Sequence, residues 1–346
     1  RHVEVSVTGL SPATQYCYRV NGAAKDGRFV TAPADKSPFS FFILGDTQTD
    51  PDVSRQIAAR MLETDPAASF ALHMGDLTGN GDDMETWECE WWDPMADFML
   101  YLPVYPVMGN HDGDASCFLR YFGILGDNST NYSFDWGSVH FIVLDVTGTL
   151  DENSDTVTWL KKELEEIREA VFTVVCHHMP PYLSTTADDE GSVARQEILV
   201  PIYERYGVAL VLSGDMHGYQ HHFTNNIHYV ISAGGGGRLY DYGLPLEGMT
   251  LQLEKTHNFS RCSVEATSLH FITYDIEGNI LDDFIITKRT PENIQARIEL
   301  AADKSEVAPV ESFTAGVYMV NAAGIDNASL SLSFCKDEPM LKLVVA

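Results

Sequence analysis

Short apolar runs alternate with longer amphipathic stretches between Phe39 and about Lys288. The runs have the β-branched and aromatic composition of buried strands, whereas the stretches between them carry apolar residues at helical spacing. Strands are predicted at Phe41–Leu44, Phe70–Met74, Val104–Val107, Val139–Leu144, Phe172–Cys176, Ala209–Leu212 and Tyr229–Ser232. Helices are predicted at Pro51–Thr64, Thr156–Ala170 and Val193–Tyr206. This alternation is typical of an α/β fold.

Both ends of the chain show a different pattern, in which polar and apolar residues alternate with period two. The segment His2–Val20 alternates on either side of a turn at Leu10–Pro12, which predicts a hairpin-like pair of strands. Thr31–Pro38 has the composition of a linker, and alternation returns in the last fifty or so residues. We therefore expect three regions, at 1–34, 39–290 and 296–346.

The charge balance restricts the partners of the protein. The formal net charge is −28 at pH 7, with 50 acidic residues against 22 Lys and Arg. Such a field repels polyanions, so the sequence argues against nucleic-acid binding and against attachment to an anionic membrane surface. No apolar run is long enough to span a bilayer. If the substrate is anionic, a bound metal is the most direct source of local positive charge.

Cysteine usage and the first residues say little about location. The six cysteines are scattered, so isolated thiols are favoured, although a Cys89–Cys117 bridge would be compatible with an oxidising compartment. The chain starts at Arg1 within a strand-like alternation, and we expect that a signal peptide lies outside it.

Metal-binding side chains follow the apolar runs. Four strand-like runs end at Asp46, at Asp76, at His178, and at Asp215 with His217, and a fifth segment offers Asn110, His111 and Asp112. Ligands in open α/β sheets bind outside the carboxyl ends of the strands, so these residues are expected to converge on one crevice. Carboxylates and an amide oxygen suit hard divalent ions, and imidazole suits Zn, Mn or Fe.

Each of these signals is weak when taken alone. A Gly-Asp pair at a strand end is more often a turn or a helix N-cap than a ligand, and single histidines such as His73 or His140 are more often core or surface residues. The combination favours chemistry, because independent turns have no reason to end successive strands in Asp, Asp, Asn, His and His. Two metal ions roughly 3.5–4 Å apart would suit a phosphoryl displacement.

The order of these motifs resembles a known family. Gly45-Asp46, Gly75-Asp76, Gly109–Asp112, Val175 with His178, and Gly214 with His217 follow the five motifs of the calcineurin-like metallophosphoesterase superfamily. The chain is most similar to the purple-acid-phosphatase-like branch over about residues 39–290. The resemblance implies a four-layer α-β-β-α sandwich with two mixed sheets. Residues 1–34 resemble the end of a fibronectin type III domain and 296–346 the start of a cohesin-like β-sandwich, which implies partial β-sandwich segments at both ends.

The resemblance also implies roles for individual residues. Asp76 would bridge two metal ions, Asp46 and His217 would hold the first, and Asn110 and His178 would hold the second. His178 is preferred to His177 because the family ligand precedes a Pro-x-Tyr sequence, matched here by residues 180–182. His111, and with it Asp112, would belong to the catalytic group, with His111 facing the scissile phosphate and protonating the leaving oxygen.

Departures from the family pattern change the expected metals. Gly79 stands where the purple enzymes have a tyrosine ligand, so a pair of divalent ions (Mn, Fe, Zn or Mg) is expected instead of a coloured ferric site. Gln48 stands where many relatives have a histidine, and it would either ligate through its carbonyl oxygen or orient a water. Asp215 replaces a histidine ligand and would favour Mn, Mg or Fe(II).

Residues outside the motifs are assigned simpler roles. The loop Ser184–Ser192 lacks the two histidines of true acid phosphatases and is expected to be a mobile acidic surface loop. The glycine-rich segment at 232–241 is expected to be a tight turn near the metals, with Arg238 as a candidate phosphate donor. His221 and His222 lie beyond the fifth motif and are expected at the surface or around the ligands.

The sequence therefore predicts a metal-dependent phosphoesterase that acts on a small phosphorylated substrate. A catalytically weak or inactive surface scaffold or adhesion module is the alternative, and within enzymes a phosphodiesterase or nucleotide pyrophosphatase. Fibronectin-like and cohesin-like neighbours occur mainly in exported bacterial proteins, so the resemblance implies an extracellular or cell-surface protein in a longer multidomain chain.

Overall fold

Two compact units make up the chain. The computed structural model describes residues 5–20, 25–126, 129–167, 170–186 and 190–288, and the backbone of four strands between 297 and 345. The first unit runs from residue 1 to 288 without 205–207, and the second takes 205–207 and the residues from 289 on. Every predicted site residue lies in the first unit. No helix among the described residues has the length and apolar character needed to cross a bilayer.

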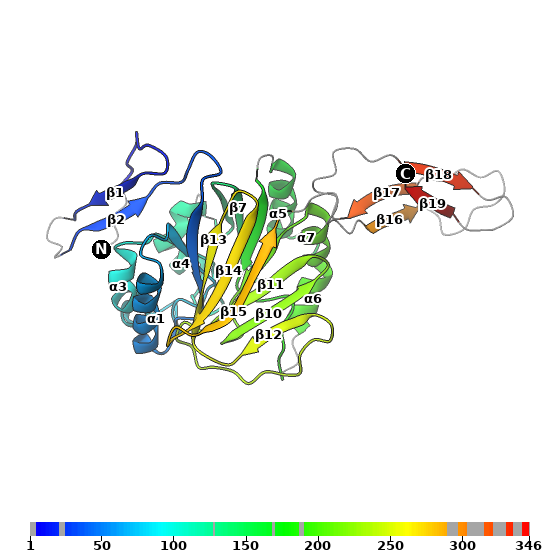
Figure 1. Ribbon diagram of the computed structural model, residues 1–346. Helices are drawn as coiled ribbons and strands as arrows, with labels where there is room; N and C mark the ends of the chain where they lie inside the picture. The colour runs from blue at the N-terminus through cyan, green and yellow to red at the C-terminus, as the bar shows by residue number, and fades with distance from the viewer. Residues whose placement is uncertain are drawn as a thin grey trace. The chain divides into compact units, whose positions relative to one another are not determined.

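One mixed sheet has six strands (Figure 1). Its order is β15 (Ile280–Thr287), β14 (Ser268–Asp275), β13 (Asn258–Val264), β3 (Phe39–Leu44), β4 (Phe70–His73) and β5 (Val104–Pro106). β3, β4 and β5 are parallel, whereas β13, β14 and β15 pair antiparallel. The chain therefore leaves β3, β4 and β5 at the same edge of the sheet.

The other mixed sheet has seven strands. Its order is β12 (Thr250–Glu254), β10 (Tyr219–Thr224), β11 (Ile227–Ser232), β9 (Leu210–Ser213), β8 (Phe172–His177), β7 (Val139–Leu144) and β6 (Tyr132–Trp136). β7, β8, β9 and β11 are parallel, and β6, β10 and β12 pair antiparallel with their neighbours. All seven predicted strands are confirmed within two residues, as β3, β4, β5, β7, β8, β9 and β11.

An apolar layer between the two sheets holds them together. Phe41 and Phe70 from the six-stranded sheet meet Phe141 of β7 edge-on, with ring centroids 5.2 and 5.6 Å apart. Trp136 packs 4.7 Å from Phe70. These rings are nearly or fully buried and belong to one continuous core that includes Val174 and other aliphatic residues of the central strands. Aromatic packing of this kind fixes the sheets in one relative position.

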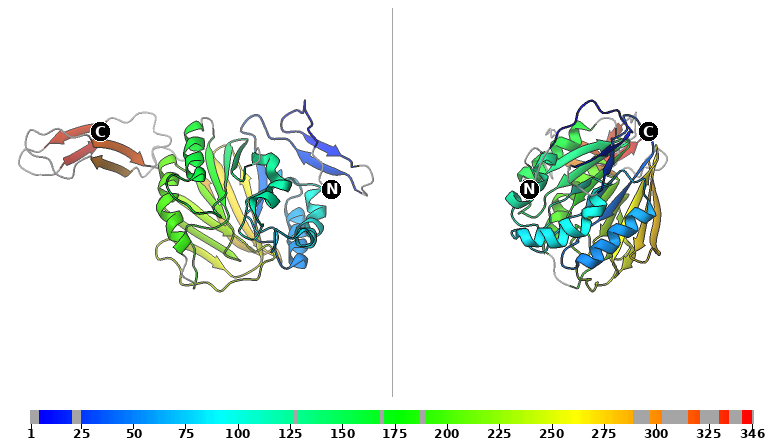
Figure 2. Two further views of the ribbon diagram at one scale, coloured as in Figure 1. Left: turned by 180° about the vertical axis from the view of Figure 1, so that it is seen from behind. Right: turned by 90° about the vertical axis from the view of Figure 1, so that its left-hand side faces the viewer.

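Helices cover the outer faces of both sheets (Figure 2). On the six-stranded sheet lie α1 (Pro51–Thr64), α2 (Met84–Thr86), the π-helix η1 (Trp87–Trp92) and α3 (Asp93–Met99). On the seven-stranded sheet lie α5 (Asp155–Glu166), α6 (Glu190–Ile198) and α7 (Val200–Tyr206). Two short helices, α4 (Ala115–Phe122) and η2 (Gly123–Gly126), follow the β5 loop. The predicted four-layer α-β-β-α sandwich is therefore confirmed.

The helix predictions are correct in place but not in every boundary. α1 has the predicted bounds and is capped by Asp50, whose carboxylate accepts from two amides of the first turn. α5 ends at Glu166, because Ile167 is extended. The helix predicted at Val193–Tyr206 is broken after Ile198, because Pro201 has no N–H for a continuing helix.

The N-terminal prediction is wrong in its pairing. Among the described residues, no strand lies before the Leu10–Pro12 turn, where Val5 and Val7 are 78% and 62% exposed. Instead β1 (Gln15–Tyr18) pairs antiparallel with β2 (Gly27–Val30). The hydroxyl of Tyr16 accepts from the amide of Ser11 at 2.8 Å and fixes the preceding turn.

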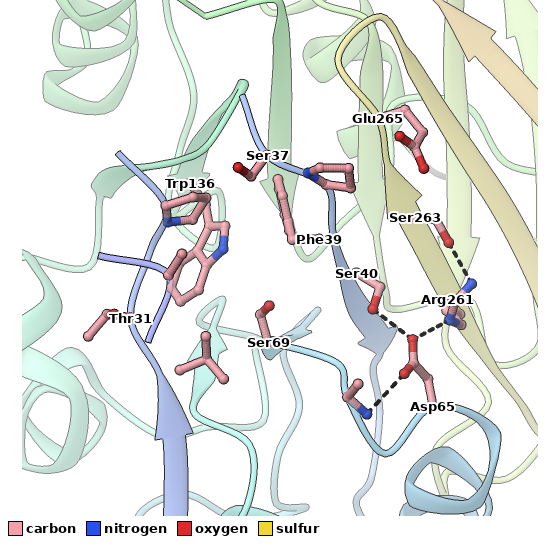
Figure 3. A pocket seen from close by; sticks show the side chains of 15 residues that line it. Thr31, Ser37, Phe39, Ser40, Asp65, Ser69, Trp136, Arg261, Ser263 and Glu265 are labelled. Carbon is pink, nitrogen blue, oxygen red and sulfur yellow. Dashed lines mark hydrogen bonds and ion pairs between the residues drawn. The ribbon is translucent and has the colours of Figure 1, made fainter. Parts of the chain in front are cut away.

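An ion pair joins the helical layer to the middle of the six-stranded sheet (Figure 3). The carboxylate of Asp65 accepts from Nε of Arg261 and from the hydroxyl of Ser40, each at 2.6 Å. Burial raises the pKa of Asp65, but these hydrogen bonds outweigh it and hold the pKa below its ordinary value. The pair borders a cavity of about 470 Å³ that the linker residues Thr31 and Ser37 also line.

The second unit contains two antiparallel pairs of strands. β16 (Arg297–Ala302) pairs with β17 (Ala315–Val320), and β18 (Leu330–Phe334) pairs with β19 (Leu341–Val345). The strand pairs agree with the alternation that predicted β-structure in this region.

We predict that Phe70→Ala destabilises the first unit by roughly 3–5 kcal/mol, because it removes a buried ring that packs against Phe41, Trp136 and Phe141. Urea unfolding followed by circular dichroism measures the loss. Ile285→Ala on β15, where the side chain is 59% exposed, is the control and should cost less than about 1 kcal/mol. Equal losses in the two variants would contradict a core centred on Phe70.

Candidate metal centre

The predicted ligands meet at the edge where the parallel strands end. Asp46 follows β3, Asp76 follows β4, and His217 follows β9, and ligand atoms of these three lie within 4.8 Å of one another. Nε2 of His178, which follows β8, is 3.3 Å from Oδ2 of Asp76 and 3.6 Å from Oδ1 of Asp215. Residues from both sheets therefore contribute to one cluster, as the motif order predicted.

Three aspartates of the cluster have an unusual backbone conformation. Asp46, Asp76 and Asp215 have φ angles of 59°, 55° and 68°, in the left-handed region. Each follows a glycine that lies within two residues of the end of a buried strand. Left-handed conformations are rare for residues other than glycine, and they persist where the surrounding structure imposes them, often at functional sites. The three Gly-Asp turns therefore share one geometry that aims the carboxylates at the strand ends.

Close backbone approach explains the glycines around the cluster. A Cβ on Gly214 would lie 2.6 Å from the carbonyl oxygen of Met74 and 2.7 Å from Oδ2 of Asp46. A Cβ on Gly109 would lie 2.2 Å from Oδ1 of Asp76, and one on Gly237 would lie 2.5 Å from the His217 ring. These positions admit only glycine without displacing a predicted ligand.

The two histidines present the same nitrogen to the carboxylates. Nδ1 of His178 donates to the carbonyl of Met74 at 2.6 Å, and Nδ1 of His217 donates to the carbonyl of Arg238 at 2.8 Å. Because a carbonyl only accepts, each Nδ1 carries a proton and Nε2 is left to face Asp76 or Asp46. This arrangement is typical of metal-ligating histidines.

His177 has a different environment. Its Nδ1 donates to the carbonyl of Met179, and its ring stacks on Tyr203. Burial lowers its pKa to about 3. The structure thus places His178 in the cluster and His177 in the core, in agreement with the choice made from the Pro-x-Tyr sequence.

Buried negative charge dominates the electrostatics of the cluster. Asp46 is fully buried and Asp76 is 2% exposed. Burial raises the pKa of Asp46 to about 6, whereas for Asp76 the attraction of His178 outweighs burial and lowers the pKa to about 2. The same carboxylates outweigh burial at His178 and raise its pKa well above its ordinary value. The site therefore favours positive charge among these carboxylates.

Two buried polar atoms fit a metal ion. Gln48 is 3% exposed and donates from Nε2 to Oδ2 of Asp76 at 3.0 Å, but its Oε1 has no hydrogen-bond partner among the described residues. Nε2 of His178 makes no hydrogen bond either and faces the carboxylates of Asp76 and Asp215. Unsatisfied buried polar atoms are rare in proteins unless an ion or water completes them. The carboxylate, amide and imidazole donors together suit divalent ions of the Mn, Fe or Zn type.

The loop after β5 holds Asp76 and its neighbours in place through hydrogen bonds. The carboxylate of Asp112 is fully buried and accepts from the amides of Asp76, Leu77 and Gly109 at 2.7–2.9 Å. These contacts fit a positioning role for Asp112 better than the catalytic role predicted from the sequence. The amide of His111 donates to Oδ1 of Asp76 at 2.9 Å, while the side chains of His111 and Asn110 are exposed.

The glycine-rich segment forms a turn beside the cluster, as expected. The amides of Gly235 and Gly237 donate to the carbonyls of Gly45 and Asp46 at 2.9 and 2.8 Å. Arg238 contributes its carbonyl to His217, and its side chain is exposed.

Tyr240 is a neighbour of the cluster that the sequence did not reveal. Its ring stacks on His217 with centroids 4.2 Å apart and an interplanar angle of 9°. Tyr240 thereby covers one face of a predicted ligand. A tyrosine shortly after a glycine turn was the only indication in the sequence.

Three further expectations differ from the structure or fall outside the described residues. His221 and His222 were expected at the surface or around the ligands, but they are 1% and 0% exposed. Nδ1 of His221 bonds Asp282 of β15 at 2.7 Å, so it joins the two sheets. The acidic loop expected at Ser184–Ser192 includes residues 187–189, which lie outside the described residues. Cys89 and Cys117 are free thiols, so the bridge considered from the sequence is not formed.

We predict that Gly214→Ala lowers the metal content of the purified protein by at least half, since the added methyl group displaces Asp46 or His178. Inductively coupled plasma mass spectrometry after reconstitution with Mn²⁺ measures it. Gly148→Ala is the matched control, because nothing lies within 4 Å of a Cβ built there. Unchanged metal content in Gly214→Ala would contradict a centre at this position.

Solved structures share this fold. A purple acid phosphatase from yellow lupin seeds superposes with a TM-score of 0.68 at 15% identity, covering 80% of this chain and 60% of that one. GAP50, described as the anchor in the inner membrane complex of Plasmodium, superposes with a TM-score of 0.62 at 17% identity, covering 73% and 90% of the two chains. At these identities the likeness concerns the fold alone.

Sequence comparison identifies the family. Purple acid phosphatase 15 of Arabidopsis thaliana is 26% identical over 289 residues, covering 68% of this chain and 53% of that protein. Purple acid phosphatase 23 of the same plant is 28% identical over 262 residues, covering 62% and 56%. The chain thus spans about half the length of the curated relatives it matches. The family model for calcineurin-like phosphoesterases matches residues 39–219, more than half of the chain. The chain belongs to the calcineurin-like phosphoesterase family, in its purple-acid-phosphatase-like branch.

Proposed function

We propose that this protein hydrolyses phosphate esters with a pair of divalent metal ions held at the strand ends. One observation carries the proposal: the buried ligand atoms of Asp46, Asp76 and His217 lie within 4.8 Å of one another. The chemistry of the donors and the family membership support it. When bound, such ions supply an activated water and neutralise charge on the phosphoryl group.

We assign the ligands by their mutual positions. Asp76 lies 3.3 Å from His178, and its ligand atom lies within 4.8 Å of those of Asp46 and His217. It would therefore bridge, with Asp46, His217 and the free Oε1 of Gln48 at one ion. His178, Asp215 and Asn110 would serve the other ion, Asn110 by the resemblance alone. This set contains one carboxylate more than the family pattern, because Asp215 stands in place of a histidine.

His111 is suited to leaving-group protonation. Its exposed ring is attached to the centre through its amide, which donates to Asp76, and its Nδ1 lies 3.2 Å from the carbonyl of Gly79. Because that carbonyl only accepts, Nδ1 is the donor and Nε2 carries a proton only in the imidazolium form. An imidazolium can pass that proton to the oxygen that leaves phosphorus.

The finer assignments rest on the sequence. We propose divalent ions because Gly79 offers no phenolate, and the amide of Gly79 instead donates to Glu90 at 2.6 Å. We propose an exported protein in which residues 1–34 and 296–346 belong to neighbouring modules around a catalytic region at 39–290. The contact from the Ser11 amide to the Tyr16 hydroxyl supports a fibronectin-like N-terminal segment, because a tyrosine corner has this form.

A scaffold without strong activity is the second candidate. Asp215 replaces a histidine ligand, and the relatives include a probable inactive purple acid phosphatase 9 of Arabidopsis thaliana and the Plasmodium anchor. Metal analysis separates the candidates, since fewer than two ions per chain after reconstitution with Mn²⁺ or Zn²⁺ favours the scaffold.

We predict that Asp76→Asn lowers metal-dependent hydrolysis of an aryl phosphate at least a hundredfold, because even the outer partners of metal ligands are worth roughly 10- to 100-fold. Steady-state kinetics with Mn²⁺ measures the loss. Asp283→Asn, at a side chain that is 51% exposed, is the control and should keep the wild-type rate. Persistent activity in Asp76→Asn would contradict the proposed centre.

We predict that Asp215→His shifts metal preference toward zinc, because imidazole replaces a hard carboxylate beside His178. Competitive reconstitution with equal Mn²⁺ and Zn²⁺, followed by metal analysis, measures the ratio. The ratio of bound zinc to bound manganese should rise roughly tenfold. An unchanged ratio would mean that Asp215 does not ligate.

A further inference from the structure

A second pocket lies next to the candidate metal centre. It has a volume of about 460 Å³ and is lined by Thr49, Asp50, Gly236, Arg238, Leu239 and His257. Residues that line it are next in sequence to residues that contact the predicted ligands. Thr49 follows Gln48, which donates to Asp76, and Gly236 precedes Gly237, whose amide donates to the carbonyl of Asp46. Two of the lining residues therefore adjoin these contacts in sequence.

The charged group of this pocket is available to a ligand. Arg238 is exposed, and its acidic neighbour Asp241 pairs instead with Lys255 at 2.5 Å. Among the described residues, no ion pair involves the Arg238 guanidinium. In a chain of net charge −28, an unpaired guanidinium beside a phosphate-processing centre attracts anions to that place.

The other lining groups complete an anion site. Nδ1 of His257 donates to the carbonyl of Gly234 at 3.1 Å, which holds the ring and leaves Nε2 for a ligand. Asp50 opposes an anion, but its carboxylate accepts from the amides of Asp52 and Val53 at the start of α1, so the positive end of that helix offsets its charge. Thr49 adds a hydroxyl group to the lining.

We propose that this pocket binds a second phosphoryl group of the substrate, so that the preferred substrates carry at least two phosphoryl groups, as in pyrophosphate or a nucleoside diphosphate. The inference rests on the proposed function, because the first phosphoryl group occupies the metal centre. Arg238 binds the second group through its planar fork of N–H donors, which matches two phosphate oxygens. The pocket is then the determinant of specificity, and the metals perform the hydrolysis.

The test compares ligands with one and two phosphoryl groups. Isothermal titration calorimetry measures the binding of inorganic phosphate and of inorganic pyrophosphate to the Mn²⁺-reconstituted protein. Arg238→Gln should weaken pyrophosphate binding roughly tenfold and phosphate binding less than about twofold, since a charge-assisted pair is lost only for the longer ligand. The carbonyl of residue 238 still holds His217, so the centre is retained.

Arg55→Gln is the matched control. Arg55 lies on α1, is 49% exposed and pairs with Asp52 and Asp93 without lining the pocket, so its loss makes the same charge change and should leave both affinities unaltered. His257→Gln is a second variant within the pocket and should weaken pyrophosphate binding selectively.

Two results would overturn the subsite: equal weakening of both ligands in Arg238→Gln, or wild-type protein that binds pyrophosphate no more tightly than phosphate. Failure of the proposed function is separate, because it appears as absent hydrolysis by the metal-loaded wild type. In the kinetic arm, Arg238→Gln should raise KM for pyrophosphate roughly tenfold and leave KM for an aryl phosphate within about twofold.

Discussion

Repulsion between buried carboxylates is the constraint on which the site depends. Asp46 and Asp76 are removed from water and lie close together, an arrangement that is costly unless positive charge lies between them. Other features of the cluster keep that charge distribution in place. The two histidines present Nε2 to the carboxylates, the left-handed turns aim the side chains, and the glycines let the backbone approach the ligands closely.

The apolar layer between the sheets fixes the relative positions of the strand ends that carry these residues. Phe41, Phe70 and Phe141 hold the two sheets in one register, so strand ends far apart in sequence stop at one place. Asp112 then links the loops after β4 and β5 through backbone amides. A metal centre built on strand ends and braced in this way needs little rearrangement to receive its ions.

The parts that the sequence predicted are those where burial leaves a simple pattern. Parallel strands with both faces covered appear as continuous apolar runs, and the Gly-Asp pairs mark their ends. β13 was not predicted, because two of its buried residues, Asn258 and Ser260, are polar and interrupt the expected apolar pattern. Both form hydrogen bonds with Ser232. The burial of His221 depends on Asp282, sixty-one residues later, and the stacking of Tyr240 on His217 depends on the turn between them. Contacts of this kind arise only from the tertiary fold.

The cluster draws its residues from both sheets, and this has a thermodynamic consequence. Asp46 and Asp76 leave the six-stranded sheet, whereas His178 and His217 leave the seven-stranded one. Ions bound among them would connect the two sheets. Their binding free energy would add to the free energy of unfolding by mass action. Thermal unfolding of the intact protein would then serve as an assay of metal occupancy that requires no substrate.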